Sequence, residues 1–211
     1  MNGGSRAMDD GRKLRLMMAA SLVCIGVAGR LAFRGLMPPG NELVAFDLWI
    51  SIGAVSVLAG SLLGRNYGIA VPVLAMAFSD MYIDTVLIGG GAVFILEIAV
   101  FTWSGFAFVG ILSSYIGRSA DFSPRGLTML TGSGIAGVLV FDAWTNFGVW
   151  LGPFYAHNAA GLALCYTMAL PFTIGHLIST AMVLPVLALP YLYLARTPDS
   201  TPIGSPERSS A

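Results

Sequence analysis

The sequence predicts an all-α, polytopic membrane protein with six transmembrane helices and a short interfacial or re-entrant helix before the sixth. Of its 211 residues, 56% are apolar and only 10% are charged, against roughly 25% charged residues in soluble domains. The mean hydropathy is +0.78. Several apolar stretches also reach the roughly 20 residues that a helix needs to cross the hydrocarbon layer. Lipid is therefore the expected surroundings of most of the chain.

The apolar stretches divide the chain into one membrane domain with two tails. The six predicted spans are residues 14–37, 43–63, 67–88, 92–116, 126–151 and 172–194. They form a single domain over residues 14–196, preceded by a cytoplasmic tail (1–13). The Ser/Pro/Thr-rich tail over 197–211 is expected to be disordered.

The segment between the fifth and sixth spans, residues 152–171, is apolar but bounded by Gly152-Pro153 and Pro171. These breaks predict an interfacial or re-entrant helix that could act as a lid. In the alternative interpretation, residues 159–194 hold two short spans and the C-terminus moves to the other side. Pro185 and Pro190 permit this, because neighbouring helices can satisfy the freed backbone groups.

Basic residues predict the orientation, since Lys and Arg accumulate in short cytoplasmic loops. With six spans they all fall on one side: Arg6, Arg12, Lys13, Arg15, Arg65, Arg118, Arg125 and Arg196. Both termini are therefore expected in the cytoplasm of a cell whose plasma or inner membrane holds the protein. The outer loops are then residues 38–42, 89–91 and the segment 152–171.

Composition excludes several classes of function. The single lysine, Lys13, lies outside the apolar runs, so a retinal Schiff base inside the membrane is excluded. Cys24 and Cys165 are too few for a disulfide framework or a CxxC site. The chain has no Walker loop, and eleven basic residues balanced by eleven acidic ones offer no surface for nucleic acid. We expect no cofactor, no metal site and no enzymatic activity.

Ionisable residues inside the spans are costly, so they mark candidate functional sites. At 1.5 Å per residue, Arg30, Arg34, Asp80 and Asp84 lie roughly 20–30 Å from the cytoplasmic ends of spans one and three. Each pair is spaced i,i+4, so its members share a helix face. Further charges in the outer half are Asp47, Glu97, Asp142 and His176. The sequence therefore predicts that Asp80 pairs with Arg30 or Arg34.

Aromatic and polar residues surround these charges, as in a small-ligand pocket that opens outward. The predicted substrate-binding residues are Arg30, Arg34, Asp47, Asp80, Asp84, Glu97, Asp142, Trp144, Asn146, Trp150, His157 and His176. Acids outnumber arginines, which favours a cationic or zwitterionic ligand. The same residues could have other roles than lining a ligand pocket. Charged side chains could snorkel to the headgroups, aromatic residues could lie at the membrane interface, and the deeper charges could form a salt-bridge network without a ligand.

Small residues recur at every fourth position of span one, a spacing that lets helices approach closely. They are Ala20, Cys24, Ala28 and Ala32. This ladder points roughly 120° away from the Arg30/Arg34 face. It could dock on a transmembrane partner or pack inside the protein's own bundle.

Several motifs resemble those of a family of bacterial and archaeal membrane transport proteins related to the substrate-binding S components of energy-coupling-factor vitamin transporters. The motifs are Ala59-Gly60, Pro72, Met76-x-x-Ser79-Asp80, Thr145-Asn146-Phe147-x-x-Trp150 and Gly161-x-x-x-Cys165-Tyr166-x-x-x-x-Pro171-Phe172. The resemblance covers residues 30–194. It implies six helices, an outward pocket for a vitamin or metal, and a coupling partner with two ATPases docked on the first helix.

The expected function is therefore capture and uptake of a small polar micronutrient: a vitamin, a vitamin precursor or a metal. A carrier that works alone is a second transport possibility. An intramembrane hydrolase would instead use Asp80 with Asp142 or Asp84 as a pair of carboxylates sharing a proton. A structural or sensory subunit is the third class.

Overall fold

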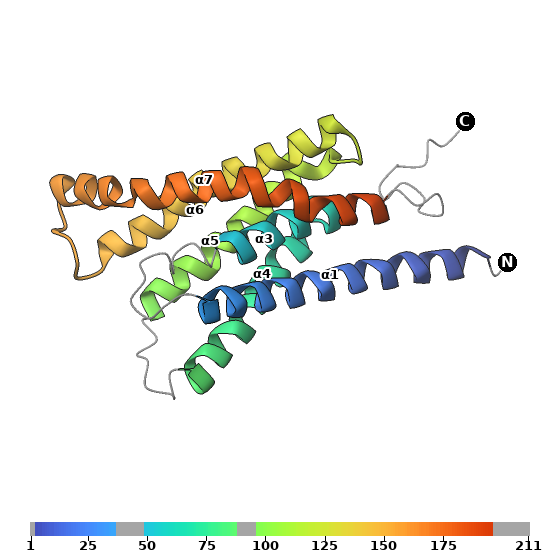
Figure 1. Cartoon of the computed structure of the whole chain (residues 1–211), viewed down its shortest axis with the longest axis horizontal. Helices are drawn as coiled ribbons and strands as arrows, with labels where there is room; N and C mark the ends of the chain where they lie inside the picture. Colours follow the sequence, from blue (N-terminus) through green and yellow to red (C-terminus); the bar gives the residue numbers. More distant parts are fainter. Residues whose placement is uncertain (1–2, 37–48, 88–95, 196–211) are drawn as a thin grey trace.

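The computed structural model describes residues 3–36, 49–87 and 96–195, and the elements within these ranges are helical (Figure 1). Five helices are long and apolar enough to cross a membrane. They are α1 (Gly3–Leu36), α4 (Arg65–Tyr82), α5 (Leu96–Ile116), α6 (Pro124–Leu151) and α7 (Ala159–Ala195). The predicted all-α class is thus confirmed for the described residues, and the five helices are compatible with a membrane protein.

A shorter run over residues 49–63, here called the central helix, occupies the place of the predicted second span. It consists of η1 (Trp49–Gly53), α3 (Ala54–Leu58) and η2 (Ala59–Leu63), where η1 and η2 are π-helical turns. Its described part is about 22 Å long, less than the roughly 30 Å of hydrocarbon. The predicted start at residue 43 and the outer loops at 38–42 and 89–91 lie outside the described residues. Five helices are therefore long and apolar enough to span a membrane, and the sixth span stays a prediction.

The first helix begins earlier than predicted. The expected N-terminal tail, residues 1–13, belongs to α1 from Gly3 onward. With 34 residues, α1 is about 51 Å long. Arg12 and Lys13 therefore lie on this helix, at the start of its apolar stretch over Gly11–Ala32. The predicted disordered tail, 197–211, lies outside the described part of the chain.

The last helix corrects both interpretations of the segment after α6. Residues 159–195 form one helix of 37 residues that includes Pro171. A separate interfacial helix and a split into two spans are therefore both wrong. Asn158 provides the start signal, because its Oδ1 accepts a hydrogen bond from the Gly161 N–H at 2.9 Å. Each proline removes one donor, and a helix packed on neighbours tolerates that loss inside a membrane.

The helices alternate in direction, so the start of α1 and the end of α7 lie at the same end of the bundle (Figure 1). Both α6 and α7 extend past the other helices at the opposite end, where residues 152–158 connect them. The central helix lies between α1 and α7 and is buried along nearly its whole length, including Ile52, Val55 and Leu58. It forms the core on which the longer helices pack.

Three glycines allow α4, α5 and the central helix to touch through their backbones. A Cβ on Gly110 of α5 would overlap the carbonyl oxygen of Gly68 on α4. A Cβ on Gly60 would likewise overlap the carbonyl oxygen of Gly110. The chain turns between the central helix and α4 at Gly64, whose φ of 96° favours glycine.

Replacing Gly110 with alanine should therefore destabilise the bundle strongly. Because backbone atoms cannot move aside as a flexible side chain can, we expect a loss at or above the upper end of roughly 1–3 kcal/mol for overpacking. Gly132→Ala is the matched control, since a Cβ there meets no atom within 4 Å. Thermal unfolding in detergent should show a lower Tm for Gly110→Ala alone. Equal Tm values for the two variants would contradict the backbone contact.

Candidate functional site

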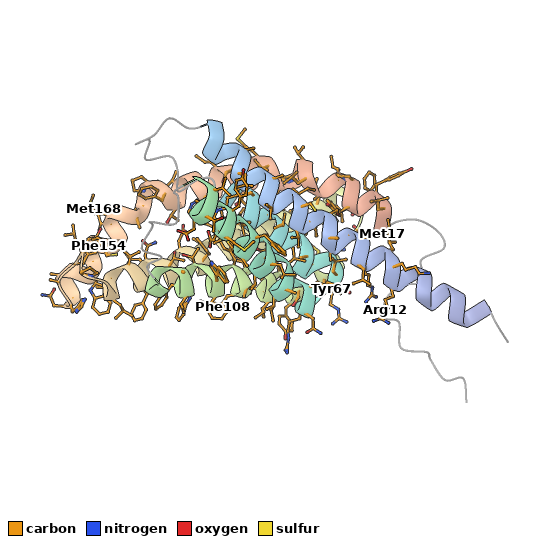
Figure 2. All side chains as sticks on the ribbon, turned by 90° about the horizontal axis from the view of Figure 1, so that it is seen from below. Arg12, Met17, Tyr67, Phe108, Phe154 and Met168 are labelled. Atoms are coloured by element: carbon orange, nitrogen blue, oxygen red, sulfur yellow. The ribbon has the colours of Figure 1, made fainter. Side chains whose placement is uncertain are left out.

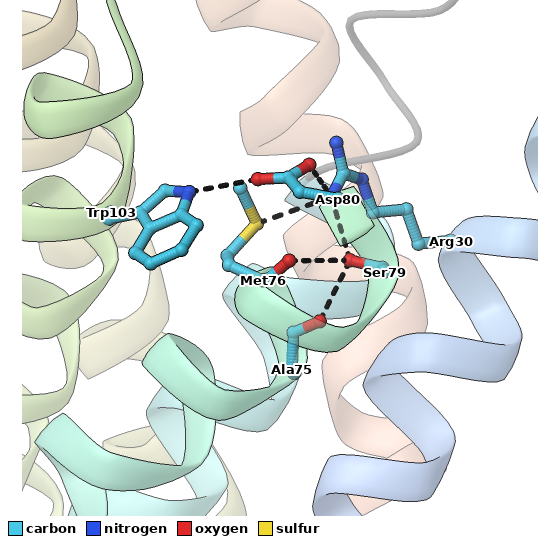
Figure 3. Close-up of polar contacts among 6 residues, drawn as sticks. All are labelled: Arg30, Ala75, Met76, Ser79, Asp80 and Trp103. Carbon is cyan, nitrogen blue, oxygen red and sulfur yellow. Dashed lines mark hydrogen bonds and ion pairs between the residues drawn. The ribbon is translucent and has the colours of Figure 1, made fainter. Parts of the chain in front are cut away.

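A polar cluster joins α1, α4 and α5 (Figure 3). Arg30 on α1 forms an ion pair through Nη1 with Oδ1 of Asp80 on α4. The same Nη1 donates a 2.7 Å hydrogen bond to Ser79 Oγ and lies 3.8 Å from Met76 Sδ. Trp103 on α5 donates from Nε1 to the second oxygen of Asp80 at 2.9 Å. We call Arg30, Ser79, Asp80 and Trp103 the polar cluster.

The predicted pairing of Asp80 with an arginine of α1 is confirmed. The two side chains are only 11% and 17% exposed. A charge this deep in a bundle needs both an ionic partner and further hydrogen bonds. Asp80 obtains them from Arg30 and Trp103, so both of its oxygens are satisfied.

Two polar atoms near this cluster are buried without a hydrogen-bond partner: Nε of Arg30 and Oδ1 of Asp84. Asp84 follows Asp80 by four residues and lies in the π-helical turn η3 (Ile83–Leu87). Such turns are frequent at functional sites. Buried polar atoms are normally satisfied, so these two are the groups that a bound polar molecule could engage.

A second buried pair joins α6 and α7. Asp142 Oδ1 lies 2.9 Å from His176 Nδ1, and each residue is 6% exposed. The ring of Trp49, at the start of the central helix, lies 5.5 Å from the His176 ring between centroids. Its Nε1 donates to Thr180 Oγ1, one turn further along α7.

Trp144 and Asn146 of α6 belong neither to the Arg30–Asp80 pair nor to the Asp142–His176 pair. Trp144 donates from Nε1 to Ser104 Oγ at 2.8 Å. Asn146 donates to the backbone oxygen of Asp142, also at 2.8 Å. Trp144 is two residues from Asp142, about 200° around the helix, and so faces another direction.

Trp150 and His157 mark the far end of the α6–α7 hairpin, where their rings lie 5.7 Å apart. Trp150 donates to the Ala156 oxygen at 3.0 Å, and a ring nitrogen of His157 lies 3.1 Å from the Gly152 oxygen. These contacts fix the turn between the helices. The prediction that these residues share one pocket with Arg30 and Asp80 is not supported, because depth along a helix does not determine which face a side chain occupies.

Three predicted site residues cannot be placed in this geometry. Asp47 lies outside the described residues. Arg34 is in the last turns of α1 and Glu97 is the second residue of α5, but only their backbones belong to the described part.

The sequence interpretation missed Ser79 and Trp103 as members of the polar cluster. Trp103 lies in the middle of its span, whereas tryptophans of membrane proteins concentrate at the interfaces. This unusual depth is the feature of the sequence that could have marked Trp103 as a site residue. Ser79 carried no signal of its own, because its hydroxyl also donates to the Ala75 oxygen at 2.7 Å, a common helix contact.

The small-residue ladder of α1 faces outward. All four of its members are exposed: Ala20, Cys24, Ala28 and Ala32. The bundle instead packs against two glycines of α1, since a Cβ on Gly26 would lie 3.1 Å from Ala75 and one on Gly29 would lie 3.0 Å from Ser51. Within the described residues, none of the four packs into the protein's own bundle, and docking on a partner stays a prediction.

A small crevice of about 10 Å³ lies between the central helix and α7, with room for no more than about one water molecule. Its lining includes Trp49, Val57, Thr180 and Leu184. Within the described ranges, no three His, Cys, Asp or Glu side chains gather as a metal site would require.

The chain belongs to a family of unknown function, DUF6580, whose model matches residues 11–200. No curated protein and no solved structure matches the chain.

Breaking the Arg30–Asp80 pair should destabilise the protein. Asp80→Asn leaves the Arg30 guanidinium buried without its counter-charge, a change that costs roughly 3–5 kcal/mol. The double variant Arg30→Gln/Asp80→Asn removes both charges and should recover part of that stability. Thermal unfolding of the single and double variants measures the coupling. Additive losses in the double variant would show that the two residues do not interact.

Proposed function

We propose that this protein captures a small polar micronutrient at the outer side of the membrane, as the solute-binding subunit of an uptake system. The observation that carries this proposal is the polar cluster beside two buried atoms without partners, Arg30 Nε and Asp84 Oδ1. Leaving such atoms unsatisfied costs roughly 1–3 kcal/mol each. A ligand that hydrogen-bonds both recovers that free energy on binding.

The charges around this site favour a cationic or zwitterionic solute. Arg30 is neutralised by Asp80, which leaves the carboxylate of Asp84 as the uncompensated charge among the described side chains of this region. An ammonium or aromatic cation would meet Asp84. In a zwitterion, an acceptor such as a carboxylate oxygen would meet Arg30 Nε.

The distribution of basic residues supports an outward-facing site. Arg12, Arg65, Arg118 and Arg125 are exposed at the end of the bundle that holds both described termini. Figure 2 marks this end by Arg12 and Tyr67, and the opposite end by Phe154. The positive-inside rule assigns the basic end to the cytoplasm. The polar cluster and the α6–α7 hairpin then lie in the outer half.

The rival interpretation, an intramembrane hydrolase, requires two aspartates that share a proton. In this fold the carboxylate of Asp80 is bonded to Arg30 and Trp103 instead. The carboxylate of Asp142 contacts His176. Asp80 and Asp142 thus each contact a different basic side chain, which favours binding over acid–base catalysis by a carboxylate dyad.

The exposed face of α1 favours a transmembrane partner. Its small residues allow a second helix to approach closely, and no helix of the described bundle covers them. In the proposed uptake system this partner is a coupling subunit driven by two ATPases, as the resemblance to S components implies.

Native mass spectrometry tests solute capture. We expect protein purified gently from its host to carry a bound small molecule, and Asp84→Asn to lose it because the carboxylate that meets its cationic group is gone. Asp121→Asn is the matched control, since Asp121 is exposed between α5 and α6. A parent protein that carries no such molecule, or an equal load on Asp84→Asn, would contradict the proposal.

The docking face is tested by Ala28→Leu. The larger side chain should hold a partner helix away while leaving the bundle intact, because Ala28 is exposed. We expect quantitative proteomics of the purified complex to show at least about a tenfold loss of the co-purifying membrane subunit, corresponding to 1.4 kcal/mol. Ala181→Leu makes the same change on an exposed position of α7 and serves as the control. Unchanged co-purification of the subunit with Ala28→Leu would exclude this face.

A further inference from the structure

The turn between α5 and α6 carries two exposed arginines. Arg118 lies in the 3₁₀ turn η4 (Gly117–Ser119), and Arg125 is the second residue of α6. Both residues are exposed, and neither takes part in the ion pairs formed among the described residues. Their guanidinium groups are therefore available to a partner outside the described bundle.

The acidic residue between the two arginines, Asp121, is turned onto the start of α6. Its Oδ1 accepts a hydrogen bond from Ser123 Oγ, and a Cβ on Gly126 would lie 2.2 Å from the same oxygen. Two guanidinium groups and one carboxylate leave the turn with a net positive charge. A surface of this charge attracts an anionic partner.

Exposed aromatic rings lie beside these charges. Phe122 of the turn contacts Tyr193 near the end of α7, with 6.0 Å between the ring centroids in an edge-to-face arrangement. Both side chains are exposed, as is that of Tyr115 near the end of α5. Tyrosines and other aromatic residues of membrane proteins are frequent at the level of the lipid headgroups. The turn thus combines cationic groups with rings of the kind that lie in the headgroup region.

The position of the turn along the bundle agrees with this level. The apolar stretches of α5 and α6 reach it from both sides, as Ala99–Ser119 and Pro124–Leu151. The turn and the end of α7 also lie at the same end of the bundle as the start of α1 (Figure 1). Side chains at the end of an apolar stretch meet the headgroups, because the hydrocarbon ends there.

We propose that Arg118 and Arg125 bind the phosphate of an anionic phospholipid whose glycerol backbone and upper chains lie against Phe122 and Tyr193. A guanidinium can donate parallel hydrogen bonds to two phosphate oxygens, which suits arginine to this headgroup. An anionic lipid keeps the negative charge that the turn attracts, whereas a choline headgroup cancels it with its own ammonium. The site therefore discriminates between lipids by charge.

The contact between Phe122 and Tyr193 gives the bound lipid a structural effect. A lipid that touches both rings joins the α5–α6 turn to the end of α7, so binding should stabilise the packing of these helices. The inference uses none of the residues assigned to solute capture or to the docking face of α1. It also holds whichever side of the membrane the turn faces.

Native mass spectrometry of the full-length protein tests this lipid site. The protein in detergent is titrated with phosphatidylglycerol and, in parallel, with phosphatidylcholine that has the same acyl chains. We expect tighter binding of phosphatidylglycerol. Its affinity should fall at least about tenfold in Arg118→Gln/Arg125→Gln, since each arginine contributes roughly fivefold. Phosphatidylglycerol should also raise the Tm of the parent more than that of this double variant.

Arg12→Gln/Arg65→Gln is the matched control, because it removes two exposed arginines of α1 and α4 at the same end of the bundle. Its affinity for phosphatidylglycerol should stay close to that of the parent. Because all four arginines are exposed, both variants should unfold at the Tm of the parent when no phosphatidylglycerol is present.

An equal loss of affinity in the two double variants would overturn the proposal, since the charge of the whole end would then attract the lipid. Equal binding of the two lipids by the parent protein would overturn it as well. So would displacement of phosphatidylglycerol by inorganic phosphate at constant ionic strength, because a free anion lacks the chains that Phe122 and Tyr193 contact.

Discussion

The arrangement of the first half of this protein depends on one buried ion pair. A guanidinium and a carboxylate inside an apolar bundle must satisfy one another and find further hydrogen bonds. Arg30 and Asp80 do so with Ser79 and Trp103. This requirement fixes the relative depth and rotation of α1, α4 and α5, because a shift by one residue would turn these side chains about 100° away from one another.

Close backbone contact makes that arrangement possible. Gly68 and Gly110 remove the side chains that would separate α4 from α5. The two helices can then present Asp80 and Trp103 at hydrogen-bond distance. On the other side of the central helix, Trp49 fills the space left open by Gly53, since a Cβ there would lie 2.8 Å from its ring. Small residues thus decide where the large and charged ones can lie.

The fold holds two polar centres of different chemistry in one membrane domain. The cluster at Arg30 and Asp80 has charge balance together with atoms left for a ligand. The pair at Asp142 and His176 is buried, and the ring of Trp49 lies against the His176 ring.

The sequence by itself determined the helical class, the approximate position of five long apolar helices and the pairing of Asp80 with an arginine of α1, Arg30 or Arg34. Apolar length and an i,i+4 spacing of charges at matched depth carry that information locally. Only the tertiary structure decided that α7 continues through Pro171 and that Asp142 meets His176 rather than joining Asp80. The face that each helix turns inward depends on its packing partners, and hydrophobicity on all sides, as in α7, leaves that face unmarked in the sequence.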